Sequence, residues 1–128
     1  MINFNKGSVF NLHPINVNDV RGEVHGLLIE GEVILCAFKT VRDQLVFTSR
    51  RVIAIDVQGL TGSRKSFSSL PYSRVQYFAI QTPSVMEIVP DSELVLVFAN
   101  GMETRFEFKG AVDIGLIGRM ISEYVLAD

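Results

Sequence analysis

Short apolar runs separated by polar breaks make up most of the chain, and three of them follow one another between Gly31 and Gly62. Residues 33–41 are apolar at almost every position, and residues 45–48 and 52–55 follow after short polar breaks. Runs of this kind, rich in β-branched and aromatic side chains and closely connected, are typical of antiparallel strands in hairpins. The pattern therefore predicts three successive strands.

Four more strands are predicted in the second half of the chain, at residues 64–70, 74–81, 93–99 and 102–109, with a loop at 83–90. Apolar or uncharged and charged side chains alternate along 102–109, which indicates one buried and one exposed face. Asn100-Gly101 joins this strand to the preceding one and predicts a type I′ turn, because both residues tolerate positive φ angles.

The strand at 93–99 is apolar on both faces, which predicts that both are covered. One face carries Leu94, Leu96 and Phe98, and the other carries Val95, Val97 and Ala99. The residues alone leave two possibilities for the second face. A neighbouring subunit covers it, or a helix of the same chain does so.

Two helices complete the predicted fold. Apolar residues recur at helical spacing from Val17 to Leu28, and Gly31 ends that segment. A second stripe begins at Ile114, after the candidate cap Asp113, and ends near residue 126. About seven strands followed by a helix predict a mainly β (α+β) fold, a strongly bent antiparallel barrel or sandwich whose open end the C-terminal helix caps.

The domain organisation follows from length and breaker residues. At 128 residues the chain has room for one hydrophobic core. Residues 1–15 are mixed and polar, with Pro14 as a breaker, so we expect an N-terminal arm there and a single domain over 16–128. The first residues lack the pattern of a secretory signal, which favours a cytoplasmic protein.

Charge and candidate chemistry argue against several classes of function. The net charge is −2 without blocks of like charge, so neither nucleic acid nor a membrane is the expected partner. His13 and His25 stand alone, and Cys36 lies within an apolar run, where a thiol acts as a small hydrophobic group. We therefore expect no metal, no cofactor and no enzymatic activity.

A set of short motifs in fixed order gives the chain a family resemblance. They lie between residues 27 and 78 and comprise Gly31-Glu32, Phe38-Lys39, Arg42-Asp43, Val46-Phe47-Thr48, Arg51, Asp56, Gln58-Gly59, Thr61-Gly62 and Pro71-Tyr72. In these residues the chain resembles the bacterial pleckstrin-homology-like (PH-like) family. The resemblance implies a PH-like barrel without catalytic activity or cofactor. It also implies that copies of the chain assemble into a cyclic ring, expected to be a pentamer, that presents a polar surface to a protein partner.

Three sets of residues are candidates for these contacts. With the resemblance included, a subunit interface at Val95, Val97 and Ala99 is favoured over cover by the chain's own helix. The partner surface is expected to hold Arg42, Asp43, Thr48, Arg51, Asp56, Gln58 and Tyr72. In the alternative interpretation, the protein binds a membrane surface or an anionic ligand such as a phosphate head group through Arg50, Arg51, Arg64 and Lys65.

Overall fold

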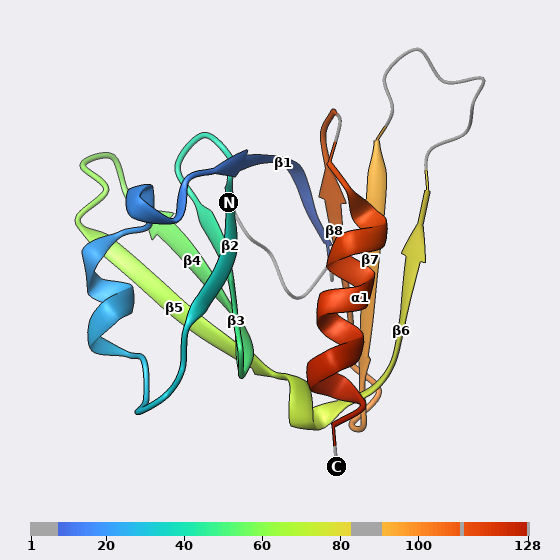
Figure 1. Cartoon of the computed structure of the whole chain (residues 1–128). Coiled ribbons are helices and arrows are strands. Elements are labelled where there is room, and N and C mark those ends of the chain that lie inside the picture. The colour runs from blue at the N-terminus through green and yellow to red at the C-terminus, as the bar shows by residue number, and fades with distance from the viewer. Residues whose placement is uncertain (1–7, 83–90, 111, 128) are drawn as a thin grey trace.

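A computed structural model describes residues 8–82, 91–110 and 112–127, so residues 1–7 of the expected arm and the loop expected at 83–90 lie outside it. Within these residues, eight strands form one sheet in the order β5-β4-β3-β2-β1-β8-β7-β6, bent into two halves (Figure 1). The strands are β1 (Ser8–Ile15), β2 (Ile34–Lys39), β3 (Gln44–Thr48), β4 (Arg51–Gln58), β5 (Arg64–Pro71), β6 (Val75–Gln81), β7 (Ser92–Phe98) and β8 (Glu103–Phe108). The seven predicted strands are confirmed, and β1 is the one that the sequence pattern missed.

Strand β1 joins the two halves of the sheet. Its first part runs parallel to β8, and its last part, from His13 to Ile15, pairs antiparallel with β2. Between them the ladder is irregular, and Asn11 has a φ of 61°, in the left-handed region that asparagine tolerates better than most residues. The placement of residues 1–15 in an arm outside the domain was therefore wrong for residues 8–15, which form a central strand.

The outer face of the β2–β5 half is covered by two short 3₁₀ segments, η1 (Val17–Asp19) and η2 (Gly22–Gly26). Val20 and Val24 are buried there and pack in one cluster with the outer face of β3 and β4. The amphipathic helix predicted over residues 17–28 was wrong, although its apolar spacing does bury these two valines. Gly22 and Gly26 lie within the segment, and glycine weakens a helix interior by about 1 kcal/mol relative to alanine.

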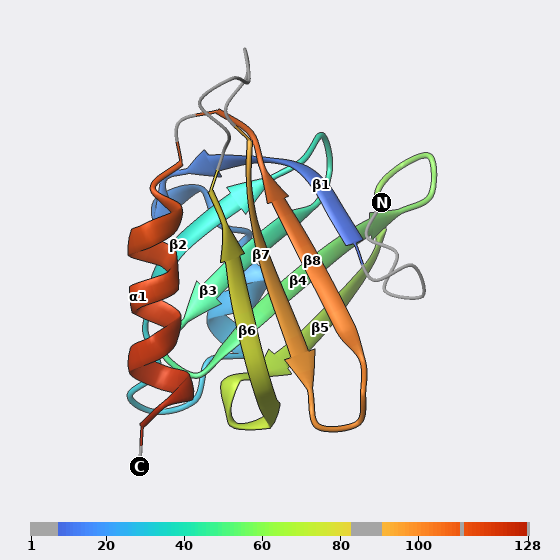
Figure 2. The same cartoon turned by 90° about the vertical axis from the view of Figure 1, so that its right-hand side faces the viewer.

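α1 (Ile114–Val125) packs against the β6 side of the β6–β7–β8 half, and Figure 2 shows the helix beside β6. Ile114, Ile117 and Ile121 of α1 join the main core, which also holds Leu94, Leu96 and the phenylalanines of β8. The Asp113 carboxylate accepts a hydrogen bond from the Leu116 N–H at 3.0 Å. The predicted C-terminal helix, its apolar stripe and its cap are thus confirmed.

The β7–β8 hairpin is confirmed, but its turn differs from the predicted type I′. Gly101 has a φ of 89°, whereas Asn100 is not in the positive-φ region. The Gly101 N–H donates to the Phe98 carbonyl and the Phe98 N–H to the Met102 carbonyl, both at 2.9 Å, which closes a three-residue loop. In such loops only the last residue takes the left-handed conformation.

Candidate functional site

Within the described residues, strand β6 forms one free edge of the sheet, and it carries neither charge nor proline. Its seven residues read VQYFAIQ, whereas the opposite free edge, β5, begins with Arg64 and Lys65 and ends with Pro71. Charged side chains and proline at an edge prevent pairing with further strands, and a long uncharged edge invites it. Sequence reasoning missed this difference, although the absence of charge in residues 75–81 was visible.

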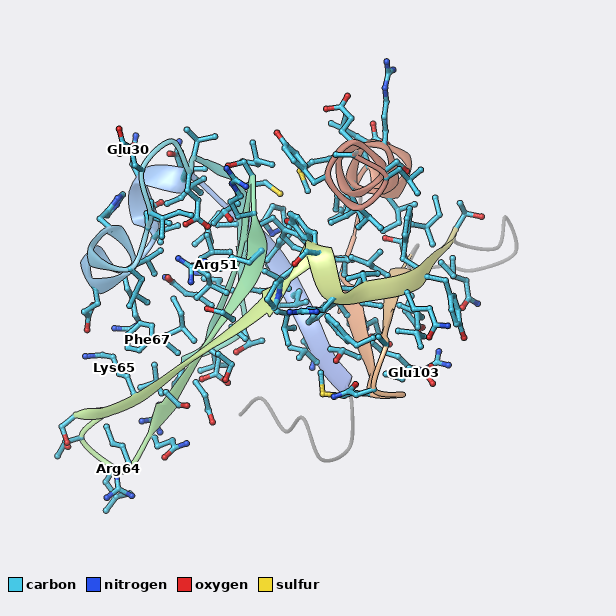
Figure 3. All side chains as sticks on the ribbon, turned by 90° about the horizontal axis from the view of Figure 1, so that it is seen from below. Glu30, Arg51, Arg64, Lys65, Phe67 and Glu103 are labelled. Carbon is cyan, nitrogen blue, oxygen red and sulfur yellow. The ribbon has the colours of Figure 1, made fainter. Side chains whose placement is uncertain are left out.

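The outer face of the same half-sheet carries a strip of apolar side chains. Tyr77 lies opposite Val97, and Ala79 lies opposite Val95. Cross-strand partners share a face, and this one points away from the main core that holds Leu94 and Leu96. Figure 3 shows Glu103, the partner of Val97 on β8, on the side of this half-sheet away from α1.

The predicted interface residues Val95, Val97 and Ala99 therefore do not lie beneath α1. Val97 is 9% exposed, Val95 is half-buried and Ala99 is exposed, while Tyr77 beside them is 58% exposed. On the β8 side, the strip ends at ion pairs that join Arg105 to Glu93 at 2.7 Å and to Glu103 at 2.8 Å. We call Tyr77, Ala79, Val95 and Val97 the outer strip.

Two predicted partner-surface residues, Thr48 and Arg51, belong to an internal network around Glu32. The Glu32 side chain is fully buried, and its carboxylate accepts two hydrogen bonds from the Arg51 guanidinium, both at 3.0 Å. The Thr48 hydroxyl donates to the same carboxylate at 2.6 Å. Burial alone would raise the pKa of Glu32, but the hydrogen bonds from Arg51, Thr48 and the Ile29 N–H outweigh it and hold the pKa below its ordinary value.

Asp43 and Tyr72 are also inside the fold, so their assignment to an exposed partner surface is corrected. The Asp43 carboxylate accepts a hydrogen bond from the Val57 N–H at 2.8 Å and so ties the β2–β3 turn to β4. The Tyr72 ring is buried and stacks on Tyr124 with the ring centres 5.9 Å apart. Three of the seven predicted residues remain available on the surface: Arg42 is exposed, and Asp56 and Gln58 are half-buried.

The four cations of the predicted anion site do not converge. Arg51 pairs with Pro71 and Gln58 with Arg64 along the β4–β5 ladder, so Arg50 and Arg51 lie at one end of this hairpin and Arg64 and Lys65 at the other. Figure 3 shows Arg51 far from Arg64 and Lys65. Arg51 is already bound to Glu32, and Lys65 forms an ion pair with Glu23 at 3.0 Å. A single anion site made by all four is excluded by this geometry.

Reactive chemistry is not apparent in the residues that the structure describes. They contain no group of three or more histidine, cysteine, aspartate or glutamate side chains that could hold a metal ion. Burial raises the pKa of the Cys36 thiol to about 11, so the thiol stays protonated at neutral pH. In the same part of the chain, no helix combines the length and the hydropathy needed to cross a bilayer.

Comparison with known proteins gives one family and several relatives. The sequence profile of the family described as "Bacterial PH domain" matches residues 3–125. The uncharacterized protein YjqA of Bacillus subtilis is 38% identical over 91 residues, which cover 71% of each chain.

Two solved structures share the fold of this chain. A protein with a pleckstrin-homology domain from Shewanella loihica superposes with a TM-score of 0.76 and 28% identity, covering 91% of this chain and 99% of that one. A pleckstrin homology domain from Shewanella amazonensis gives a TM-score of 0.65 and 32% identity over 88% and 90% of the two chains.

Proposed function

Because the chain belongs to the bacterial PH domain family, we propose that it is a non-catalytic module whose copies assemble head to tail into a closed ring. The ring presents a polar surface to a protein partner. The observation that carries this proposal is the uncharged free edge of β6, which continues into the apolar outer strip.

The two free edges differ in chemistry, and this difference supports a head-to-tail contact. A contact between unlike surfaces is repeated around an axis and closes if the rotation divides a full turn. The β6 edge and the outer strip supply one surface, and a different surface of the next copy supplies the other. Each Å² of apolar surface that such an interface removes from water contributes about 25 cal/mol of favourable free energy, which favours assembly.

The polar surface of the proposed ring lies on the other half of the sheet. Arg42 on the β2–β3 turn is exposed, and Asp56 and Gln58 of β4 are hydrogen-bonded to each other at 3.0 Å with part of their surface open to solvent. These side chains offer donors and acceptors on a rigid hairpin, which suits recognition of a polar protein surface.

Light scattering on the purified protein tests the assembly. We expect a mass that is a multiple of the 14.3 kDa chain, five copies in the ring implied by the family resemblance. Ala79→Lys places a charge on an exposed position of the β6 edge and should shift the mass towards one chain without loss of folding. Val41→Lys, on the β2–β3 turn, is the matched control and should leave the mass unchanged.

A monomer at micromolar concentration in the unmodified protein would contradict the ring. A stable dimer would indicate a two-fold contact instead of a head-to-tail one. Val97→Asp is a less clean test, since that side chain is only 9% exposed and a charge there can unfold the chain.

A second candidate function is binding to an anionic membrane surface. It is favoured by exposed apolar side chains on two turns at one end of the sheet. Val41 on the β2–β3 turn and Leu60 on the β4–β5 turn are fully exposed. An Arg42 guanidinium N–H donates to the Gly59 carbonyl and holds the two turns together. Lys39 and Arg64 are exposed near the same end of the sheet, so apolar and cationic groups occur together, as in interfacial membrane binders.

Co-sedimentation with vesicles tests this second function. Binding to vesicles with anionic lipid that weakens as salt increases, and that is lost in a Val41→Asp, Leu60→Asp double variant, would favour the membrane surface over the protein partner. Neutral vesicles are the control. Equal recovery of the protein in the supernatant with and without anionic vesicles would exclude binding to an anionic membrane.

A further inference from the structure

The side of α1 that faces β2 carries two hollows, of about 300 Å³ and 750 Å³. The first is lined by Leu116 and Met120 of α1 and by Leu35 and Cys36 of β2. The second is lined by Tyr124, Val125 and Ala127 and by Gly31 and Glu32, which precede β2. Leu116, Met120 and Tyr124 are spaced four residues apart and therefore lie along one face of the helix. We call the two hollows together the α1–β2 groove.

Apolar side chains line this groove, and several are exposed to solvent. Leu116 is 63% exposed and Ile29, which borders the second hollow, is 57% exposed. Leu35, Cys36 and Met120 are each partly exposed. Single exposed apolar residues are common on protein surfaces, but several that line hollows along one face of a helix indicate a contact site.

Strand β2 contributes a free backbone edge to the groove. β1 pairs with Ala37, Phe38 and Lys39 only, because it ends at Ile15, opposite Ala37, and the chain then enters η1. Within the described residues, the first half of β2, Ile34 to Cys36, is therefore paired on one side only, with β3. Leu35 falls at a shift in the β2–β3 register and has no partner on either neighbouring strand. An added strand would supply partners for these backbone groups.

The wider end of the groove is positively charged. Arg50 is exposed there, and no ion pair to it occurs among the described residues. Glu32, an acid that lines the same hollow, is neutralised by Arg51.

We propose that the α1–β2 groove binds an extended segment of another protein, which pairs with the free edge of β2, buries apolar side chains against α1 and places an acidic side chain at Arg50. The segment is short. From Leu116 to Val125, the last residue of α1, the helix rises by about 14 Å, at about 1.5 Å per residue. An extended chain covers that length with about four residues.

A protein segment fits the groove better than a small lipid or metabolite does. Sites for small molecules enclose most of the ligand surface, whereas both hollows here are open along the surface of the protein. A helical ligand would leave the free edge of β2 unpaired, because a helix satisfies its own backbone groups. An extended segment uses the edge, the apolar walls and the cation together.

The test uses seven-residue fluorescent peptides in which valine and threonine alternate over five positions and two aspartates stand at one end or the other. We expect saturable binding by fluorescence anisotropy, with slower hydrogen exchange at residues 34–36. Leu116→Glu, a change at an exposed position, should weaken binding at least tenfold. Val41→Glu is the control and should bind as the unmodified protein does.

Charge reversal tests the role of Arg50. Arg50→Glu should bind the aspartate peptides at least tenfold more weakly and should recover affinity for peptides with two lysines in place of the aspartates.

The proposal is overturned if no peptide binds, if protection appears away from β2, or if Leu116→Glu binds normally. A Leu116→Glu variant with altered mass in light scattering would show that the groove is a contact between copies. If decanoate displaced the peptide at a concentration equal to or lower than that of the peptide, the groove would be assigned to a small amphiphile. Both results would overturn the proposal without bearing on the β6 edge.

Discussion

The side chains of Arg50 and Arg51 are neighbours in the sequence but have different surroundings in the fold. Arg51 donates to Glu32, to the Leu27 carbonyl at 2.6 Å and to the Ser69 hydroxyl at 3.0 Å, and its side chain is only 19% exposed. Arg50 is exposed. The network therefore joins the segment before β2 to β4 and β5 through one guanidinium.

Arg51→Ala should destabilise the protein by about 3 kcal/mol, because it leaves the buried Glu32 carboxylate without its cation. Urea unfolding followed by circular dichroism measures this difference. Arg50→Ala is the matched control and should change the free energy of unfolding by about 0.5 kcal/mol or less. Equal effects of the two substitutions would contradict the structural role of Arg51.

Glu32 also predicts a dependence of stability on pH. Its pKa in the folded protein lies below the ordinary value of 4.5, so its ionised form stabilises the fold above that value. This contribution is lost as the pH falls below 4.5 and through the lowered pKa. Glu32→Gln should be less stable at pH 7 and should lose less further stability between about pH 5 and 3 than the unmodified protein does. If urea titrations over that range showed the same loss in free energy of unfolding for both proteins, the prediction would be wrong.

The motif residues could be recognised in the sequence, but whether each is buried could not. Glu32, Thr48 and Arg51 are polar and were therefore expected at a surface or left without a role. Arg51 also donates to the Leu27 carbonyl and Glu32 accepts from the Ile29 N–H, so the loop before β2, which lies outside the strand pattern, completes their network. A polar group that is buried with its partners has the same sequence signature as one that is exposed.

At the scale of secondary-structure elements, periodicity predicted α1 correctly and failed for residues 17–28. Both segments space their apolar residues by three and four positions. In α1 the stripe is long enough to span the main core, and Asp113 caps it. In the earlier segment Gly22 lies between the buried valines and Gly26 follows them, and the chain forms separate 3₁₀ turns instead.

The two glycines of α1 also have different roles. A side chain at Gly118 would meet Ile80 of β6 at 3.2 Å, so helix and strand approach each other closely there. At Gly115 the nearest group is the capping Asp113 carboxylate at 3.5 Å, an ordinary contact. Residue 118 therefore has to be glycine because the helix packs closely on β6 there. At residue 115 no close approach to a strand requires glycine.

Gly115→Ala should stabilise the protein by about 0.5–1 kcal/mol, since alanine is the better helix former. Gly118→Leu should destabilise it by about 1–3 kcal/mol, because the larger side chain has to displace Ile80. Thermal unfolding measures both effects on the same helix. Stabilisation by both substitutions would show that α1 does not pack closely on β6.

At the scale of the whole molecule, the sequence predicted the two halves of the sheet but not the strand that joins them. Strand pairs in hairpins are local, so their patterns and turns can be read from the sequence. β1 pairs instead with β2 across two 3₁₀ turns and with β8 near the other end of the chain. It contains Pro14 and bends at Asn11, so neither alternation nor turn signals mark it.

Leu12→Ala should destabilise the protein by about 2–4 kcal/mol, because the side chain is fully buried in the main core. His13→Ala, one position along the same strand and exposed, should change stability by about 0.5 kcal/mol or less. Denaturant titration distinguishes them. If Leu12→Ala were as stable as the His13 variant, β1 would not be part of the cooperative fold.

The pairing of β1 with β8 has a consequence for biosynthesis. Strand β1 is synthesised long before its parallel partner β8, which ends at Phe108. Contacts between such distant parts of a chain slow folding. The nascent protein should therefore acquire protease resistance only after β8 has left the ribosome, and until then chaperones can meet its unpaired strands.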